Sequence, residues 1–208
     1  MSWNLYHGRA VDPAGRSLLN EFAAALDGWD WDVALLQEVP PWWPPLLGRA
    51  SGACARWVLT SRNFGLGVRR AVSARNPDLL KANGGGCNAI LVRGRVQEHR
   101  VVRLTWWPER RWAHGVRVGP WWVVNLHAST HRDVWAARDV ARAARAWPVE
   151  APLLFGGDLN LKRPALPGLV HLGGNHVDHF FARGAAGSGF EVLDRGSLSD
   201  HPPIRVTL

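Results

Sequence analysis

Polar residues that could perform metal and phosphate chemistry lie where apolar, strand-like runs of this 208-residue chain end. They are Asn4, Glu38, His127, Asp158, Asn160, Asp178, Asp200 and His201. Because the ends of neighbouring strands can point several side chains at one pocket, we expect these residues to assemble into an active site. Crowded carboxylates repel one another unless a hard cation holds them together. The residue types therefore predict a divalent-metal site.

Two short motifs within this group have spacings that suit phosphate chemistry. In Gly157-Asp158-Leu159-Asn160, Asp158 and Asn160 are two residues apart, so both face the same way on an extended segment. One can hold or polarise a nucleophilic water while the other donates a hydrogen bond to a phosphoryl oxygen. In Asp200-His201, a carboxylate adjoins an imidazole whose tautomer Asp178 could fix. A lone buried acid or histidine is usually structural, so the coherence of the group carries the interpretation.

The elements that must position these residues are mostly strands. We expect strands at residues 33–39, 56–61, 88–92, 96–106, 116–126, 153–155, 177–181, 191–193 and 204–208, and helices at 17–27 and 131–147. The run at 33–39 is continuously apolar, which is typical of a strand buried on both faces. Many strands with few helices favour packed sheets with outer helices over a doubly wound parallel sheet.

Size and composition predict a single soluble domain over residues 1–208, with 47% hydrophobic and 20% charged residues. No apolar stretch approaches the length that spans a bilayer. The first motif begins at Ser2, so we expect no signal peptide and a cytoplasmic location. Two isolated cysteines, Cys54 and Cys87, fit a reducing compartment. No feature indicates a protein partner.

The net charge of +8 is concentrated in the middle of the chain. Residues 56–117 hold thirteen Arg or Lys side chains against three carboxylates. Such an excess suits a polyanionic substrate, because phosphate contacts supply much of the affinity for nucleic acids. The alternative is an arginine-biased composition of genomic origin, since Lys81 and Lys162 are the only lysines.

Tryptophan is abundant, with thirteen residues, and two pairs stand out. Trp42-Trp43 lies in a proline-rich loop just after Glu38, and we expect it to stack on a base or cover an apolar part of the substrate. Trp106-Trp107, beside Arg110-Arg111, is a second candidate. Four further histidines are interpreted as structural or surface residues: His7, His171, His176 and His179.

Taken in order, the motifs resemble the endonuclease/exonuclease/phosphatase superfamily, whose best-known members are deoxyribonuclease I and the abasic-site endonucleases. The matching stretches are Ser2-Trp3-Asn4-Leu5, Leu36-Gln37-Glu38-Val39, Val124-Asn125-Leu126-His127, Gly157-Asp158-Leu159-Asn160, Val177-Asp178-His179-Phe180 and Leu198-Ser199-Asp200-His201-Pro202. The resemblance covers the whole chain. It implies a four-layer α/β sandwich, in which two mainly antiparallel sheets pack face to face with helices outside.

The resemblance also implies hydrolysis of a phosphoester with Mg²⁺, for which Mn²⁺ could substitute. It assigns Glu38 as the principal metal ligand, with Asn4 and Asp200 completing the metal–water shell. Asp158 would orient or deprotonate the attacking water. Asn160 and His127 would bind the scissile phosphate, and His201, oriented by Asp178, would be a general base or a phosphate clamp. Asn88 is a further candidate for a phosphate or supporting contact, while no acidic partner for His127 is evident.

Three hypotheses about function follow. The first is a metal-dependent phosphodiesterase, a nuclease acting on DNA or RNA. The second keeps the chemistry but changes the substrate to a small phosphorylated metabolite, a phosphoinositide or a phospholipid. The third, from a different class, is a non-catalytic binding module with the same fold; it would be favoured by loss of an acid or histidine, and none is missing from the set.

Overall fold

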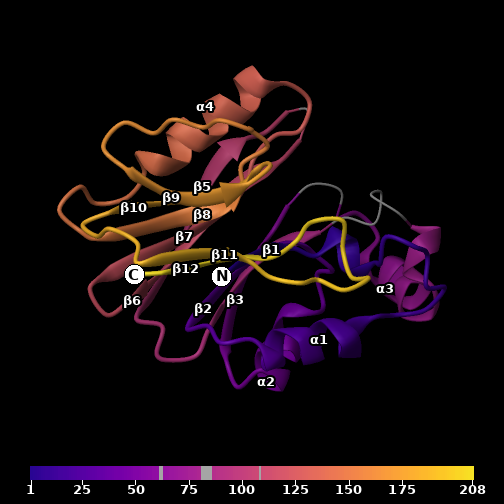
Figure 1. Cartoon of the computed structure of the whole chain (residues 1–208). Coiled ribbons are helices and arrows are strands. Elements are labelled where there is room, and N and C mark those ends of the chain that lie inside the picture. Colours follow the sequence, from indigo (N-terminus) through magenta and orange to yellow (C-terminus); the bar gives the residue numbers. More distant parts are fainter. Residues whose placement is uncertain (61–62, 81–85, 108) are drawn as a thin grey trace.

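Two six-stranded sheets face each other in the computed structural model (Figure 1). The helices α1, α2 and α4 lie on the outer sides of the sheets, and α3 lies beyond one end of them (Figure 1). The structure describes residues 1–60, 63–80, 86–107 and 109–208. The strands are β1 (Ser2–Asn4), β2 (Val33–Val39), β3 (Cys54–Leu59), β4 (Cys87–Val92), β5 (Glu98–Thr105), β6 (Arg111–Val118), β7 (Trp121–His127), β8 (Leu153–Asp158), β9 (Val170–Asn175), β10 (Asp178–Arg183), β11 (Gly189–Val192) and β12 (Ile204–Thr207). The helices are α1 (Leu19–Gly28), α2 (Pro44–Ala50), α3 (Leu66–Arg75) and α4 (Asp133–Ala144), with 3₁₀ turns η1 (Tyr6–Gly8) and η2 (Pro77–Leu79).

The two sheets are built on the same plan. Their strand orders are β11-β12-β1-β2-β4-β3 and β5-β6-β7-β8-β10-β9. In each sheet one central pair is parallel, β1 with β2 and β7 with β8, and all other neighbours are antiparallel. The expected fold class, a sandwich of mainly antiparallel sheets with outer helices, is therefore confirmed.

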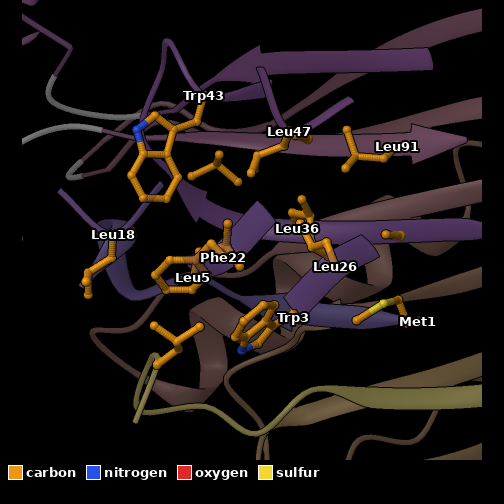
Figure 2. Packing of buried hydrophobic residues seen from close by; sticks show 14 of the residues in the cluster. Met1, Trp3, Leu5, Leu18, Phe22, Leu26, Leu36, Trp43, Leu47 and Leu91 are labelled. Carbon is orange, nitrogen blue, oxygen red and sulfur yellow. The ribbon is translucent and has the colours of Figure 1, made fainter. Parts of the chain in front are cut away.

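The central strands are apolar on both faces because each sheet has a core on both sides. In β2, Leu36 packs under α1 and α2 with Trp3 and Phe22 (Figure 2). Its neighbour Leu35 points the other way, into the layer between the sheets, where it meets Ile90. A third cluster joins α4 to the outer face of the second sheet through residues such as Val140 and Phe155. Three apolar layers thus separate four layers of secondary structure.

The expected strand at residues 116–126 is wrong, because the chain turns within it. Gly119 has φ of 57°, a left-handed conformation that favours glycine, and it separates β6 from β7. Apolar residues on both sides of the turn hid this break in the sequence. The helices α2 and α3 and the strand β9 were not among the expected elements.

None of the helices among the described residues has the length and apolar character needed to cross a membrane.

The clearest expected helix, at residues 131–147, is α4, which begins at Asp133 and ends at Ala144. Its buried apolar residues, Ala136, Val140 and Ala143, recur at helical spacing, so one face packs on the sheet while the arginine-rich face remains outside.

Candidate active site

The candidate site lies where the two parallel strand pairs end. Parallel neighbours end at the same edge of a sheet, and the register pairs Asn4 with Gln37 in one sheet and His127 with Asp158 in the other. Because the sheets face each other, these ends bring Asn4, Glu38, His127 and Asp158 together. Asp178, the first residue of β10, pairs with Asp158 across the antiparallel ladder.

Asp158 is the centre of this group, and its side chain is almost fully buried. Its Oδ2 atom accepts a hydrogen bond from Asn4 Nδ2 at 3.0 Å. The same oxygen lies 3.6 Å from His127 Nε2 and 4.0 Å from His201 Nε2. Burial raises the pKa of Asp158, although the positive charge of His201 and the Asn4 hydrogen bond oppose the shift. One carboxylate therefore links the two histidines that the sequence singled out.

Glu38 approaches the same centre from the first sheet, with its side chain 22% exposed. Its Oε1 atom lies 4.0 Å from His127 Nε2, and its Oε2 atom lies 3.0 Å from His7 Nε2. Burial and the charge of Asp158 raise the pKa of Glu38 to about 7. Glu38 has φ of 50° within an irregularity of the β2–β4 pairing, a strained conformation of the kind that collects at functional sites.

His7 was interpreted as structural or superficial, yet its ring contacts the predicted metal ligand Glu38. It reaches Glu38 because the chain after Asn4 curls into η1, where Tyr6 and His7 both have positive φ. The Tyr6 amide donates to Asn4 Oδ1 at 3.0 Å and fixes this curl. Gly8 in the sequence was the only signal of such a turn.

His201 and Asp178 form the closest side-chain pair of the site. His201 Nδ1 lies 2.7 Å from Asp178 Oδ2, as the sequence motifs predicted. Burial disfavours a charge on His201, but the hydrogen bond to Asp178 and the nearby carboxylates outweigh it and raise the pKa of His201 to about 9. The ring therefore carries a proton at neutral pH and directs Nε2 toward Asp158 and Asp200, 4.0 and 3.9 Å away.

His127 has the opposite electrostatic character. Burial, together with the positive charge of Arg111, lowers the pKa of His127 well below its usual value, so the ring is neutral. The acidic partner that the sequence did not reveal is Asp158, with Glu38 slightly farther away. Arg111 was also overlooked as a site residue. It is buried, and its Nε atom donates to Glu109 Oε2 at 2.8 Å.

Two other predicted residues lie beside the carboxylates. Asn160 follows β8 with φ of 51°; its backbone amide donates to Asp158 Oδ1 and its side-chain Nδ2 donates to Ala128 O, both at 3.1 Å. Asp200 is exposed, and its charge contributes to the raised pKa of Glu38. Both lie at the rim of the group.

The residues predicted to contact the substrate, Trp42, Trp43 and Asn88, are wholly or partly buried. Trp43 is 3% exposed and packs inside the apolar cluster against Phe22 (Figure 2), so the expectation that it stacks on substrate is wrong. Gly8 provides the room, because a Cβ atom there would lie 2.4 Å from the Trp43 ring. Trp42 is partly buried against the same cluster. Asn88 is fully buried and donates to the Trp112 carbonyl at 3.3 Å, so it bridges the sheets rather than facing a substrate.

The donor set suits a hard divalent cation. The carboxylates of Glu38, Asp158, Asp178 and Asp200 and the amide of Asn4 offer oxygen atoms, and Mg²⁺ and Mn²⁺ prefer such ligands. Asp178 Oδ1 is buried and has no hydrogen-bond partner among the described residues. Ligand atoms of Asp158, Asp178 and His201 lie within 4.8 Å of one another. A protonated His201 ring donates hydrogen bonds from both nitrogens and offers no lone pair to a metal ion. The metal ligands in this arrangement are therefore the carboxylate and amide oxygen atoms.

Paired carboxylates, an imidazole–carboxylate pair and a neutral histidine thus lie together at one end of an α/β sandwich. The Endonuclease/Exonuclease/phosphatase family model matches residues 1–201, and the chain belongs to this family of phosphoester hydrolases. Among curated proteins, no relative matches the chain in sequence.

Solved structures share the fold over nearly the whole chain. An endonuclease/exonuclease/phosphatase from Beutenbergia cavernae is 19% identical with a TM-score of 0.71, and the match covers 99% of this chain and 69% of that one. A humanized D. rerio TDP2 is 17% identical with a TM-score of 0.67, covering 99% and 96%. A mannosyl-6-phosphatase from Bacteroides thetaiotaomicron is 16% identical with a TM-score of 0.67, covering 99% and 97%.

Proposed function

We propose that this chain is a divalent-metal-dependent phosphodiesterase that cleaves DNA or RNA by in-line attack of an activated water. The observation that carries the proposal is the position of Asp158, whose Oδ2 atom lies within 4.0 Å of Asn4, His127 and His201. Hydrolysis at phosphorus requires a positioned water and neutralisation of the added charge, rather than a covalent nucleophile. The site offers a buried carboxylate for the first task and hydrogen-bond donors for the second.

We assign the cation to Glu38, Asn4 and Asp200, with Mg²⁺ as the natural ion and Mn²⁺ as a substitute. When bound, it neutralises charge on the phosphate and on the crowded carboxylates. Burial, followed by repulsion from Asp158, raises the pKa of Glu38 to about 7, and this cost of a charged Glu38 supports a cation at this position.

The remaining residues act on the water and on the phosphate. Asp158 accepts a hydrogen bond from the attacking water and holds it in line. The neutral ring of His127 and the amide of Asn160 donate to phosphoryl oxygens. His201 carries a proton near Asp158 and serves as a cationic clamp, while Asp178 holds its ring by the 2.7 Å contact at Nδ1. His7 contacts Glu38 and orients it.

A second candidate function keeps this chemistry with a small phosphorylated metabolite as substrate. The similar mannosyl-6-phosphatase is a protein of this fold that acts on a sugar phosphate. We favour a nucleic acid because the excess of basic residues between residues 56 and 117 suits a polyanionic substrate.

Hydrolysis by the purified protein tests the proposal. The substrates are supercoiled plasmid, single-stranded DNA, RNA, sugar and inositol phosphates, and a chromogenic bis-aryl phosphodiester, each with Mg²⁺ and with chelator. Wild type is compared with Glu38→Ala and His201→Ala. A control, Glu191→Ala, removes an exposed carboxylate that pairs with Arg205 outside the site.

We expect nucleic-acid and bis-aryl phosphodiester hydrolysis that chelator and both site variants abolish and that the control retains. Preferential turnover of a sugar or inositol phosphate would replace the nuclease proposal with the second candidate. Folded protein that neither binds Mg²⁺ nor hydrolyses any substrate would contradict an enzymatic role and favour a binding module.

A further inference from the structure

Two adjacent tryptophans in the β5–β6 connection are exposed. Trp106 is 56% exposed and Trp107 is 83% exposed, whereas Trp3, Trp43 and Trp122 are buried. Leaving two indole rings in water forgoes the free energy that burying them would provide. The pair is therefore a candidate binding surface rather than part of the core.

Arginines surround this pair. The guanidinium carbons of Arg103 and Arg110 lie 5.5 and 4.3 Å from the centroid of the Trp106 ring. Trp106 and Trp107 also line an open hollow of about 440 Å³, together with Arg103, Arg138 and Arg142. The surface thus combines flat aromatic rings with cations from both β5 and α4.

The nearby carboxylate of Asp139 is not exposed at this surface. It is fully buried and accepts hydrogen bonds from Thr105 Oγ1 and Ser129 Oγ, both at 2.6 Å. These bonds join the end of β5, the segment after β7 and α4, so they hold the arginine-bearing helix beside the tryptophan connection. The combination of charge and position indicates an anionic, base-bearing ligand.

The surface adjoins the candidate active site. Residue Ala113 of β6 pairs with Leu126 of β7, so the connection before β6 lies at the same sheet edge as His127. Arg111 begins β6, and its charge acts on Glu38, His127 and Asp158. Arg110, which stacks on Trp106, is its immediate neighbour. A polymer bound at the catalytic carboxylates can therefore continue onto the tryptophans.

We propose that Trp106 and Trp107 form a stacking platform for single-stranded nucleic acid next to the scissile phosphate, and that Arg103, Arg138 and Arg142 bind the flanking phosphates. The proposal rests on the proposed function and deepens it by naming the strand type. Unpaired bases present open faces to indole rings, while bases within a duplex are already stacked on one another.

Binding without turnover tests this platform. The probe is a fluorescein-labelled thymidine dodecamer in chelator, followed by fluorescence anisotropy with wild type, Trp107→Ala and Trp107→Phe. A second probe replaces the central bases by abasic sites and keeps every phosphate. Trp57→Ala, which removes a 41% exposed tryptophan from β3 in the other sheet, is the matched control.

We expect Trp107→Ala to weaken binding of the dodecamer about tenfold, the scale of one lost base stack, while Trp107→Phe and Trp57→Ala stay close to wild type. The alanine variant should also lose most of the wild-type preference for the dodecamer over the abasic probe. Neutralising Arg103 and Arg142 should reduce the salt dependence of binding by roughly 0.7 in the log–log slope per phosphate contact removed.

Equal binding of both probes by wild type, or unchanged binding by Trp107→Ala, would overturn the platform. The proposed function is judged separately, from wild-type hydrolysis of the bis-aryl phosphodiester. Hydrolysis without base-dependent binding rejects the platform alone, and base-dependent binding without any hydrolysis rejects the enzymatic proposal alone.

Discussion

Gln37 and Asn125 hydrogen-bond to each other across the interface between the two sheets. Gln37 Nε2 donates to Asn125 Oδ1 at 2.8 Å, and Asn125 Nδ2 donates to the carbonyls of Leu36 and Ala89 at 2.9 and 2.8 Å. Gln37 immediately precedes Glu38, and Asn125 lies two residues before His127. This buried contact therefore fixes the relative position of the two strand ends that carry the candidate site.

Gly157 allows the sheets to approach at this contact. A Cβ atom at Gly157 would lie 2.1 Å from Leu126 O and 3.1 Å from both Asn125 Oδ1 and Gln37 Nε2. Its φ of 129° also disfavours any side chain. The glycine before Asp158 thus has a packing role, which sequence reasoning could not separate from an ordinary turn.

We predict that Asn125→Ala lowers the free energy of unfolding by about 3 kcal/mol or more. The variant removes the side-chain donor of the Leu36 and Ala89 carbonyls and one of the three acceptors of the Gln37 amide. Each unsatisfied buried group costs roughly 1–3 kcal/mol. Urea denaturation monitored by tryptophan fluorescence measures the effect. Asn20→Ala, an exposed change on α1, should stay within about 0.5 kcal/mol of wild type. A similar small loss in Asn125→Ala would mean that the contact does not hold the sheets together.

We predict that Glu38→Gln weakens binding of Mn²⁺ at least about tenfold, because the amide keeps the shape but removes a charged oxygen ligand. Electron paramagnetic resonance of free Mn²⁺ measures binding without relying on activity. The exposed carboxylate of Glu191 provides the matched control Glu191→Gln. Equal affinity in wild type and Glu38→Gln would remove Glu38 from the proposed ligand set.

We predict that Asp178→Asn and His201→Gln each lower kcat by about 10²–10⁴-fold and that their effects are not additive. Asp178 acts through His201, since its Oδ2 atom is held 2.7 Å from Nδ1 of that ring. The double variant should therefore be no slower than the slower single variant. Kinetics with the bis-aryl phosphodiester measure all three. Multiplicative losses would show that the two side chains act independently.

The positions of most site residues were predictable because each follows an apolar run that forms a strand. Asn4, His127 and Asp158 are where the strands end, and parallel pairing brings those ends together. The Asp178–His201 pair was also predicted correctly. These features depend on strand direction and on short motifs, which a sequence displays directly.

The errors concern residues whose surroundings come from distant segments. Trp43 was expected to face a substrate, but Phe22 packs against it and Gly8 leaves room for its ring. His7 was dismissed, but positive φ angles in η1 turn it toward Glu38. Positive φ angles, and glycines that make room for a ring from a distant segment, do not change the composition or the hydrophobic periodicity. A single sequence therefore could not reveal them.

His114 supplies a further prediction, which concerns stability against acid. It is fully buried in β6, with Nδ1 3.1 Å from His99 Nε2 and Nε2 3.5 Å from Asn125 Nδ2. Burial, followed by the charge of His99, lowers the pKa of His114 well below its usual value. The pKa of His99 is lowered as well, by burial and by Arg56. Both rings therefore stay neutral in the folded protein at pH values where free histidines are charged.

The sign of the effect follows from proton uptake. Below about pH 6.5 the unfolded chain binds a proton at His114 that the folded chain does not, so the free energy of unfolding falls as pH decreases. The loss approaches about 1.4 kcal/mol per pH unit for this residue, until the pH reaches its folded-state pKa.

A His114→Gln variant should be less stable at pH 8, because it disturbs a packed site, but should lose less stability between pH 6.5 and 5.5. Urea denaturation at pH 8, 6.5 and 5.5 measures how the free energy of unfolding changes with pH in wild type and in His114→Gln. Parallel curves for the two proteins would mean that His114 takes up its proton equally in both states, and that the contact with Asn125 tolerates a charged ring.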